Sequence, residues 1–426
     1  MKVSIIGLGS RGKNYGTHLS KMQDVQIVAV CDKYRNKVDI VGKMWGVAEN
    51  MRFTDENEFF ALGKVADVMV IATQDRDHYS HSKKALELGY NLLVEKPLSP
   101  IIEECLELEK LARVKGLKVL VCHVLRYAPY YRKIKEIIAS GILGEVKEIR
   151  HSENISYWHY THSYVRGNWR REDTTSPLLL AKCCHDADLL YWFTGSKCKS
   201  LSSYGSQSYF NHANAPEGAA QNCFDCKLRT TCLFEAEYQY CGRKTLIGRT
   251  KPKFPWGTYA FCQSADKKDI LAALKTGERG KEFARCVFHC DNNVVDRQTV
   301  MMEMQNGIIC TLTVDAFNDK NHRHTEIRGS KGMLIADDSH SVLTLKLFDK
   351  AAKRITVNPL AVLKGHYGGD QGIVKAVYNI LNVDGDYPGY TWIKDTVESH
   401  RIVAAAELSR AKNGEKVDMQ TIPDII

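Results

Sequence analysis

Gly7-Leu8-Gly9-Ser10-Arg11-Gly12 is the stretch of sequence that decides the fold, because of what surrounds it. The run before it, Lys2–Ile6, is apolar and rich in β-branched residues, which predicts a strand. The residues after it, 14–22, can continue as a helix. A glycine-rich turn between a strand and a helix is typical of a dinucleotide-binding site.

Each glycine has a separate role in such a turn. Gly7 permits the tight turn, Gly9 lets the backbone approach a pyrophosphate, and Gly12 lets the helix and the strand pack closely. The pyrophosphate then lies on unpaired N–H groups at the start of the helix, where Ser10 and Arg11 stand. The sequence therefore predicts a nucleotide on the first turn of the chain.

A carboxylate in the right place selects between two cofactors. The second predicted strand, Val25–Cys31, ends in Asp32, twenty residues beyond Gly12. A carboxylate there accepts hydrogen bonds from the adenosine ribose and repels a ribose phosphate. We therefore expect NAD, although Lys33 and Arg35 leave NADP open.

Composition excludes several classes of protein. The 426 residues are 44% hydrophobic and 26% charged, which argues against disorder and favours two domains. The net charge of +9 is spread along the chain, so we expect no nucleic-acid partner. No apolar stretch approaches the ~20 residues of a membrane span. A strand that starts at Lys2 leaves no room for a signal peptide, so we expect a cytoplasmic protein with reduced cysteines.

The order of predicted elements indicates an α/β fold in two domains. Residues 1–122 alternate strands and helices, which predicts an NAD(P)-binding Rossmann domain with a doubly wound parallel sheet. Residues 123–426 predict a substrate-binding and oligomerisation α/β domain with a large, mostly antiparallel open sheet and a helix near 178–193. An insert at about 203–290 carries most of the clustered cysteines and has few apolar residues of its own.

A second motif follows the predicted strand Asn91–Val94, which runs directly into Glu95-Lys96-Pro97. Upstream, Ile71-Ala72-Thr73-Gln74 is followed four residues later by His78. Both segments would face the cofactor at the carboxyl edge of an open sheet. Taken alone, Lys96 would be a surface cation before a turn-forming proline.

Joined to the glycine turn, this motif resembles the Gfo/Idh/MocA oxidoreductase family, the relatives of inositol and glucose–fructose dehydrogenases. The resemblance also rests on Arg126 and Gly144, and it is strong over the first domain and looser over the second. The motifs and the resemblance together give the predicted cofactor-binding residues: Gly7, Gly9, Ser10, Arg11, Gly12, Asp32, Thr73, Gln74, His78, Glu95, Lys96 and Arg126.

The resemblance carries further expectations about architecture and activity. It implies a site between the two domains and assembly through the open sheet face, hence a homo-oligomer, either a dimer or a tetramer. It also implies oxidation of a sugar-type alcohol, or the reverse reaction, with NAD or NADP. In that family the lysine of Glu-Lys-Pro contacts the reacting oxygen, which carries over to Lys96.

The candidate proton carrier is His185, within the run Lys182-Cys183-Cys184-His185-Asp186-Ala187-Asp188. The family places one aspartate four residues before a histidine and another three residues after it. His185 and Asp188 fit that spacing, but position 181 is alanine. Lys182 either replaces the missing group as a donor or lowers the pKa of His185 by like-charge repulsion. The alternative is that His185 has no catalytic role and that its hydrogen bonds are satisfied within the start of the helix in which it lies.

Two segments supply candidate substrate contacts. The glycine-rich loop Gly365–Asp370 can bring His366 towards a polyhydroxylated substrate, with Asp370 either binding a hydroxyl or capping a helix. The other segment is aromatic and polar, and either binds a sugar or covers the sheet. Its candidate residues are Tyr157, His162, Arg166 and Trp169.

The insert contains a pattern of cysteines that suits a metal. Cys223-x2-Cys226-x5-Cys232 supplies three thiolates. The fourth is Cys241, Cys286 or Cys290, of which Cys290 is the predicted ligand. A structural zinc would fix the insert, and it is preferred to an iron–sulfur cluster or to free thiols.

These features lead to one preferred function and two alternatives. The preferred function is transfer of a hydride between nicotinamide and a hydroxyl of a sugar, polyol or sugar derivative, with Lys96, His185 and Lys182 as candidate catalytic residues. The first alternative is a glycoside hydrolase that uses NAD catalytically, by transient oxidation, elimination, hydration and reduction. The second is a cofactor-sensing regulator without catalysis, which the presence of both Lys96 and His185 disfavours.

Overall fold

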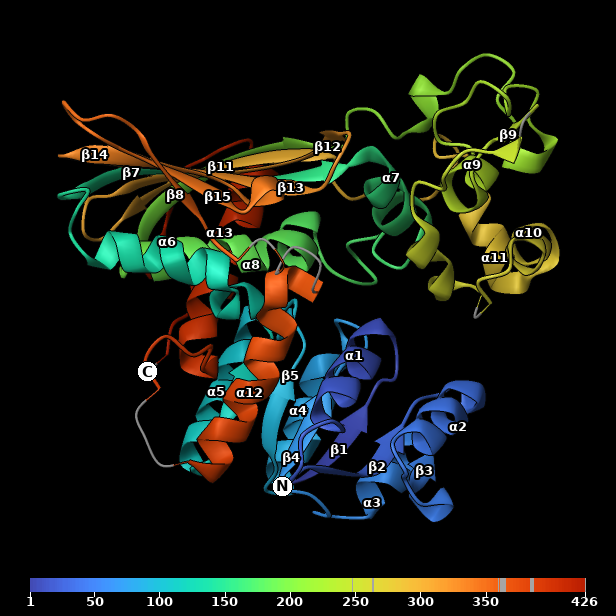
Figure 1. The fold of residues 1–426 in the computed structure, drawn as a ribbon, viewed down its shortest axis with the longest axis horizontal. Coiled ribbons are helices and arrows are strands. Elements are labelled where there is room, and N and C mark those ends of the chain that lie inside the picture. Colours follow the sequence, from blue (N-terminus) through green and yellow to red (C-terminus); the bar gives the residue numbers. More distant parts are fainter. Residues whose placement is uncertain (247, 263, 359, 361–364, 384–386, 426) are drawn as a thin grey trace.

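The structure, a computed structural model, describes residues 1–246, 248–262, 264–358, 360, 365–383 and 387–425. Figure 1 shows a parallel sheet with its helices at one end of the molecule and a second, larger sheet at the other. A layer of helices lies between them, and the insert projects beside the larger sheet. No helix in the described part of the chain is long and apolar enough to cross a membrane.

The first sheet has the order β3-β2-β1-β4-β5-β6, and all of its pairs are parallel. This confirms the predicted Rossmann sheet. Its strands are β1 (Lys2–Ile6), β2 (Gln26–Cys31), β3 (Arg52–Phe53), β4 (Val68–Ile71), β5 (Asn91–Val94) and β6 (Val119–Val121). Its helices are α1 (Ser10–Leu19), α2 (Arg35–Met44), α3 (Glu56–Ala61), α4 (Asp77–Glu87) and α5 (Ile102–Val114).

The turn between β1 and α1 requires glycine at two positions. Gly7 has φ +88°, and a Cβ there would lie 2.4 Å from the carbonyl oxygen of Ala72. A Cβ on Gly12 would lie 1.9 Å from the carbonyl oxygen of Gly7. Any side chain at either position would therefore push α1 away from the sheet.

The second sheet has the order β16-β15-β14-β13-β7-β12-β11-β8-β17 among the described residues. The β7–β12 pair is parallel and the other pairs are antiparallel, as predicted. Its strands are β7 (Val146–Ser156), β8 (Cys198–Ser206), β11 (Arg297–Met304), β12 (Ile309–Asn318), β13 (His322–Gly329), β14 (Gly332–Asp337), β15 (Val342–Leu347), β16 (Lys353–Thr356) and β17 (Val417–Asp418).

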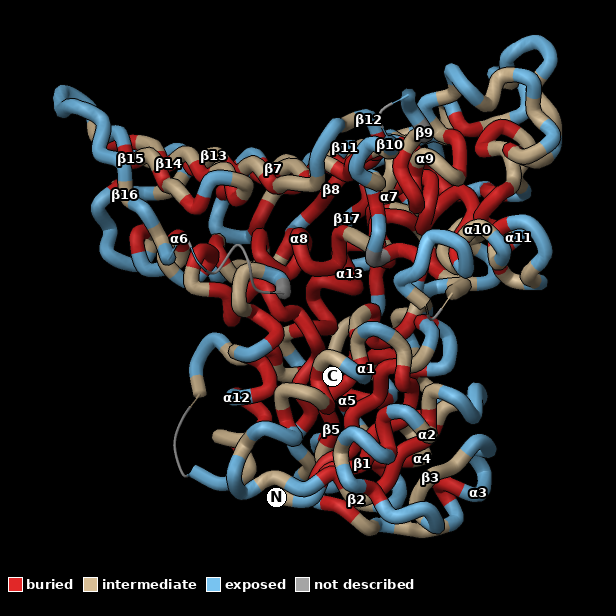
Figure 2. The backbone as a smooth tube through the Cα atoms, turned by 45° about the vertical axis from the view of Figure 1, so that its right-hand side comes forward, coloured by how far each residue is buried: buried red, intermediate tan, exposed pale blue. Residues whose placement is uncertain are grey.

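Helices cover one face of this sheet, as Figure 2 shows by their burial. They are α6 (Pro129–Ala139), α8 (Leu178–Thr194) and α13 (Ile393–Ala411), with α7 (Tyr157–Tyr160) beyond the end of β7. Exposed and buried residues alternate along β11, so its other face is open. Helix α8 corresponds to the helix predicted near 178–193.

The C-terminal part of the chain returns to the first domain. Helix α12 (Gly369–Asn382) packs Ile373, Val377 and Ile380 into the apolar core of the Rossmann domain, next to Leu120. Leu120 also forms an isolated bridge with Trp392. The boundary at residue 122 stays a prediction, because this late segment contributes to the first core.

The insert contains the helices α9 (Ala236–Cys241), α10 (Lys267–Thr276) and α11 (Glu278–Phe283), and the short strands β9 (Lys244–Thr245) and β10 (Gly248–Arg249). The sequence indicates an insert with few apolar residues, yet it has a small core of its own. Tyr240, Phe254, Leu274 and Phe283 are buried in that core.

Candidate active site

Lys96 and α8 meet where β5 ends. The Lys96 ammonium lies 2.5 Å from the carbonyl oxygen of Ala181. His185 follows Ala181 by four residues, so it stands one helical turn later on the same helix. The two predicted catalytic residues thus come from separate domains: Lys96 contacts α8 at Ala181, and His185 lies one turn further along that helix.

His185 is buried and surrounded by other titratable side chains. Its ring centroid lies 5.5 Å from that of His123 and 6.2 Å from that of His366. Its Nδ1 atom has no hydrogen-bond partner among the described residues. Burial lowers the pKa of His185 well below its ordinary value, and the charge of Lys96 lowers it further. The imidazole is therefore neutral at neutral pH and can accept a proton.

Lys182 points to a different set of partners. Its ammonium forms an ion pair with Glu153 on β7, at 3.1 Å, and Glu153 also pairs with Arg323 at 2.6 Å. Among the cations that lower the pKa of His185, Lys96 contributes most. In the structure it is thus Lys96, rather than Lys182, whose positive charge lowers the pKa of His185 by repulsion.

The glycine turn leaves room for a nucleotide. A Cβ built on Gly9 would meet no atom within 4 Å, so the turn is open on that side. Asp32 directly follows β2 beside the turn, where its carboxylate accepts hydrogen bonds from the N–H groups of Leu8 (2.7 Å) and Tyr34 (3.0 Å). A carboxylate has about four acceptor sites, so Asp32 keeps capacity for a ribose diol. These residues fit an adenine dinucleotide.

Arg11 connects three distant parts of the chain. Its guanidinium lies 2.7 Å from Glu95 and 2.8 Å from Asp370, at the start of α12. It also contacts the Tyr15 hydroxyl and, at 3.3 Å, Nδ1 of His366. The glycine turn, the Glu95-Lys96-Pro97 motif and the Gly365–Asp370 loop are thereby joined.

Residues after β4 shape the loop next to Lys96. His78 Nδ1 donates to the carbonyl of Pro97 at 2.6 Å, and the Thr73 hydroxyl contacts His81 at 3.1 Å. The Gln74 side chain accepts a hydrogen bond at 3.4 Å from Asn168, in the second domain. Of these predicted cofactor-binding residues, His78 supports the loop that carries Lys96.

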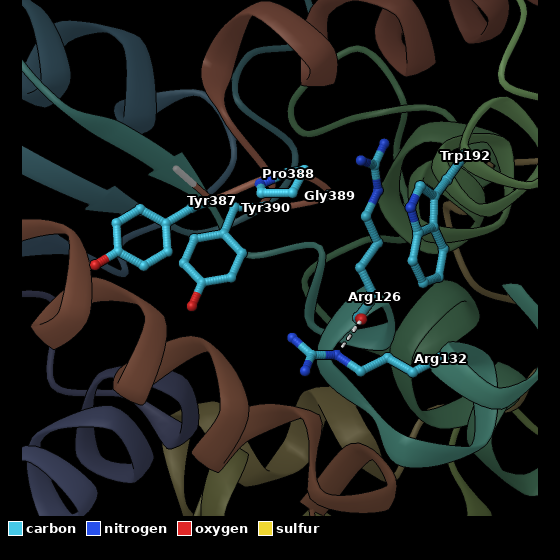
Figure 3. A pocket seen from close by; sticks show the side chains of 7 residues that line it. All are labelled: Arg126, Arg132, Trp192, Tyr387, Pro388, Gly389 and Tyr390. Carbon is cyan, nitrogen blue, oxygen red and sulfur yellow. Dashed lines mark hydrogen bonds between the residues drawn. The ribbon is translucent and has the colours of Figure 1, made fainter. Parts of the chain in front are cut away.

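Arg126 lies in a buried ion pair. Its guanidinium forms a bidentate pair with Asp188 on α8, at 2.7 and 2.6 Å. It lines a separate cavity of about 340 Å³ together with Trp192 and the segment 387–390 (Figure 3). Arg126 therefore fixes α8, the helix that carries His185, to the segment Val124–Tyr127.

The predicted substrate contacts are divided between two places. His366 and Asp370 lie beside Arg11, with 3.0 Å between His366 Nδ1 and the Asp370 carboxylate. Trp169 donates to Asp75 at 3.1 Å, at the contact between the domains. Of the predicted substrate contacts, His366, Asp370 and Trp169 therefore stay candidates to face a substrate.

The other three predicted contacts, Tyr157, His162 and Arg166, pack towards the insert. His162 Nδ1 lies 2.7 Å from the Tyr240 hydroxyl, and burial lowers its pKa to about 3. The Tyr157 ring is 6.0 Å from that of Phe234. The structure therefore does not bring these three residues to His185.

Two buried histidines at the site were not predicted. His123 lies two residues after the strand β6, and neither of its ring nitrogens has a partner among the described residues. Its place after a parallel strand is a signal that sequence reasoning could have used. His400 accepts a hydrogen bond from the Leu98 N–H at 2.9 Å. It sits within a long helix, and nothing in its sequence context indicates the site.

The predicted zinc ligands lie in the insert, away from these residues. Cys223, Cys226 and Cys232 line a small cavity together with Cys286, whereas Cys290 lies on the following turn. No group of three or more His, Cys, Asp or Glu side chains in the described ranges is arranged to hold a metal ion.

Curated relatives with sequence similarity include oxidoreductases and a 2,7-anhydro-N-acetylneuraminate hydratase of Mediterraneibacter gnavus, which is 25% identical over 40% of this chain and 41% of its own length. The putative oxidoreductase YteT of Bacillus subtilis is 21% identical over 76% of this chain and 75% of its own length. The D-glucoside 3-dehydrogenase of Escherichia coli is 28% identical over 34% of this chain and 41% of its own length.

Solved structures share the whole fold. A scyllo-inositol dehydrogenase from Lactobacillus casei, with bound NAD(H) and scyllo-inositol, matches with a TM-score of 0.65 and 19% identity, over 99% of both chains. A family model described as "Oxidoreductase family, NAD-binding Rossmann fold" matches residues 1–123. Its companion, "Oxidoreductase family, C-terminal alpha/beta domain", matches residues 135–419. The chain therefore belongs to the Gfo/Idh/MocA family of oxidoreductases, with an NAD-binding Rossmann domain.

Proposed function

We propose that this protein transfers a hydride between NAD and a hydroxyl-bearing carbon of a sugar, polyol or sugar derivative. The observation that carries the proposal is the contact of Lys96, at the carboxyl edge of the nucleotide-binding sheet, with the carbonyl of Ala181 on α8, one helical turn before His185. A neutral base and a cation beside one another are the two groups that oxidation of an alcohol needs.

In the proposed reaction, neutral His185 accepts the proton of the substrate hydroxyl. The Lys96 ammonium has three N–H donors, of which one bonds to Ala181, and within the described part of the chain the other two remain for the substrate oxygen. Their positive charge stabilises the negative charge that develops on that oxygen as its proton leaves. The glycine turn and Asp32 would hold NAD, which would supply the acceptor for the hydride of the alcohol carbon, so that the product would be a ketone or aldehyde.

The loop that carries His366 supports a polyhydroxylated substrate. The His366 side chain is 40% exposed, lies near His185 and is held by Asp370. An exposed imidazole with one nitrogen fixed by a carboxylate has its other nitrogen free for a second hydroxyl. The similarity to a D-glucoside 3-dehydrogenase supports a pyranoside with neighbouring hydroxyl groups.

His366 also favours one alternative, NAD-dependent cleavage of a glycoside. That reaction needs a second base, because a carbon-bound proton must leave next to the newly formed ketone. His366, 6.2 Å from His185 between ring centroids, is a candidate for this base. Net oxidation of free sugars requires no such group.

A panel of sugars and aryl glycosides, assayed for NADH and for aglycone release in the same samples, tests the proposal. Accumulation of NADH supports the dehydrogenase, and aglycone release without NADH supports the glycosidase. Tight NAD binding with no turnover on any compound would favour a regulator and contradict both.

We further propose that the protein is cytoplasmic and self-associates through the open face of the second sheet. Tyr204, Met301, Phe317 and Phe348 are exposed large apolar side chains of this sheet region. Sedimentation velocity on the wild type and on Met301→Lys distinguishes an oligomer built on this face from a monomer.

A further inference from the structure

Two segments of the insert that are far apart in sequence lie side by side. Asn222 and Arg285 form an isolated antiparallel bridge. The Cys223 N–H donates to the carbonyl of Ala284 at 2.8 Å, and the Cys286 N–H donates to that of Gln221 at 2.9 Å. This pairing brings Cys286 next to the Cys223–Cys232 motif.

Four cysteines line one small cavity. Cys223, Cys226, Cys232 and Cys286 surround a space of about 20 Å³. Cys290, the fourth ligand expected from the sequence, instead donates through Sγ to the carbonyl of Cys286 at 3.2 Å. The set that faces the cavity is thus Cys-x2-Cys-x5-Cys with a distant Cys286.

A buried cation lies against this cavity. Arg166 is completely buried, and its guanidinium bonds to neutral groups: the carbonyls of Arg285 and Phe234, the Gln239 side chain, and Cys223 Sγ at 3.4 Å. No carboxylate of the described residues lies within 4 Å of it. A buried charge is costly unless it is paired, so this site requires a negative group.

The carboxylate that lines the same cavity is already paired. Glu235 lies 3.0 Å from Arg229 and accepts a hydrogen bond from the Tyr238 N–H at 2.6 Å. With two arginines and one glutamate at the cavity, a net positive charge remains. Four thiolates bound to a metal centre carry a net negative charge and would balance it.

The size of the cavity distinguishes two metal centres. A zinc ion holds its sulfur ligands about 2.3 Å from its centre, which leaves no space of water size between them. The cavity here has such a space, and no described group of side chains is arranged to hold a single metal ion. A cubane of iron and sulfide is larger, and it also takes four cysteine ligands.

We propose that Cys223, Cys226, Cys232 and Cys286 bind a four-iron, four-sulfide cluster, with Arg166 as the buried cation that faces it. Hydrogen bonds to ligand sulfurs are a recognised feature of such clusters. The role is structural: the cluster joins the Cys223–Cys232 loop to the segment around Cys286.

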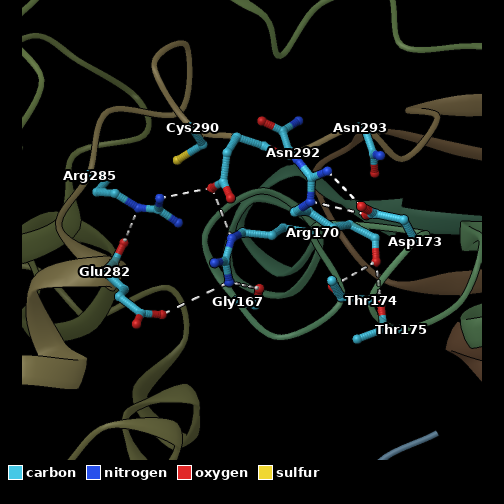
Figure 4. A network of polar contacts seen from close by, with 12 residues as sticks. Gly167, Arg170, Asp173, Thr174, Thr175, Glu282, Arg285, Cys290, Asn292 and Asn293 are labelled. Carbon is cyan, nitrogen blue, oxygen red and sulfur yellow. Dashed lines mark hydrogen bonds and ion pairs between the residues drawn. The ribbon is translucent and has the colours of Figure 1, made fainter. Parts of the chain in front are cut away.

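Contacts outside the cavity hold that segment in place. Arg170 and Arg285 each bond to Asp291 at 2.9 Å, within the polar network that also contains Cys290 (Figure 4). The ion pairs of Asp291 therefore hold the segment around Cys286 on the side away from the proposed cluster.

The test is purification of the full-length protein without oxygen, from cells supplied with iron, followed by measurement of iron, acid-labile sulfide and zinc. We expect four iron and four sulfide per chain, as for a cluster with four cysteine ligands, and a visible absorption band that dithionite bleaches. Zinc without sulfide, or no metal at all, would overturn the proposal whatever the variants do.

Paired variants test the ligand assignment. Cys286→Ser and Cys226→Ser should lose at least half of the iron and sulfide, whereas Cys290→Ser and Cys262→Ser should keep both. If Cys290→Ser lost its iron and sulfide while Cys286→Ser kept them, the assignment of the fourth ligand would be contradicted. If Cys286→Ser is insoluble, the iron and sulfide content of the wild type and of Cys290→Ser still decides the proposal.

Discussion

The Lys96 ammonium lies 2.5 Å from the carbonyl oxygen of Ala181, one helical turn before His185. This contact joins the motif after β5 of the Rossmann domain to a helix of the second domain. It sets the cation beside the imidazole and explains in part why the pKa of His185 is low. The proposed chemistry depends on this relationship.

Replacing Lys96 tests the cation directly. Lys96→Ala should lower kcat at least a hundredfold, about 2.7 kcal/mol, because the developing oxyanion loses its positive partner. The affinity for NAD should stay within tenfold, about 1.4 kcal/mol. Steady-state kinetics and calorimetry measure the two quantities, with the exposed Lys110→Ala on α5 as the control. Undiminished kcat would remove Lys96 from the mechanism.

The Arg11–Asp370 pair should stabilise the fold. Asp370→Asn leaves a largely buried guanidinium with one carboxylate partner fewer, so we expect a loss of about 1–3 kcal/mol in the free energy of unfolding. Asp39→Asn, which breaks the exposed Arg35–Asp39 pair, should cost less than about 0.5 kcal/mol. Urea unfolding of both variants provides the comparison, and equal losses would contradict the assigned role.

Acid should destabilise the protein through buried neutral histidines. Burial lowers the pKa of His123, His162 and His400 to about 3. The unfolded chain therefore binds protons first, and stability is full above pH ~6.5 and falls as the pH drops towards 3. Between pH 7.5 and 5.5 the three groups together should cost up to about 4 kcal/mol.

One variant checks the predicted direction of this pH dependence of stability. His162→Gln removes one of the three groups, so its stability should depend less on pH by about 1.4 kcal/mol at pH 5.5. The measurement is the free energy of unfolding in urea at both pH values. A steeper dependence than that of the wild type would show that His162 is protonated in the folded protein.

The pH profile of catalysis should reflect the lowered pKa of His185. Burial and the Lys96 charge keep this imidazole neutral, so kcat/KM for alcohol oxidation should not fall between pH 8 and about 6.5. The acid limb should appear only below that range. A limb centred at or above pH 6.5 would show that a group with an ordinary or raised pKa is the base.

The local patterns of the first domain predicted its fold, because strand, glycine turn and helix each depend on neighbouring residues. Lys96 and His185 could be selected by motif, and the structure brings them together. The bonds of Arg11 with Asp370, 359 residues later, could not be predicted. Nor could the position of His400, because packing between distant segments sets both.

The predicted sugar contacts show a second limit. Tyr157, His162 and Arg166 belong to an aromatic and polar stretch that suits carbohydrate binding, but the insert supplies them with other partners. Tyr240 binds His162, and the cysteine cavity lies against Arg166. Residue type alone cannot distinguish a surface that binds sugar from one that packs on another part of the chain.

The central claim is that the alcohol carbon gives its hydride to NAD while His185 takes the hydroxyl proton. The most direct measurement uses a substrate found in the panel, deuterated at the oxidised carbon, with mass spectrometry of the recovered cofactor. We predict deuterium in the reduced nicotinamide of the wild type, and transfer at least a hundredfold slower in His185→Ala. Turnover with no deuterium in the cofactor, or unchanged transfer in His185→Ala, would contradict the account.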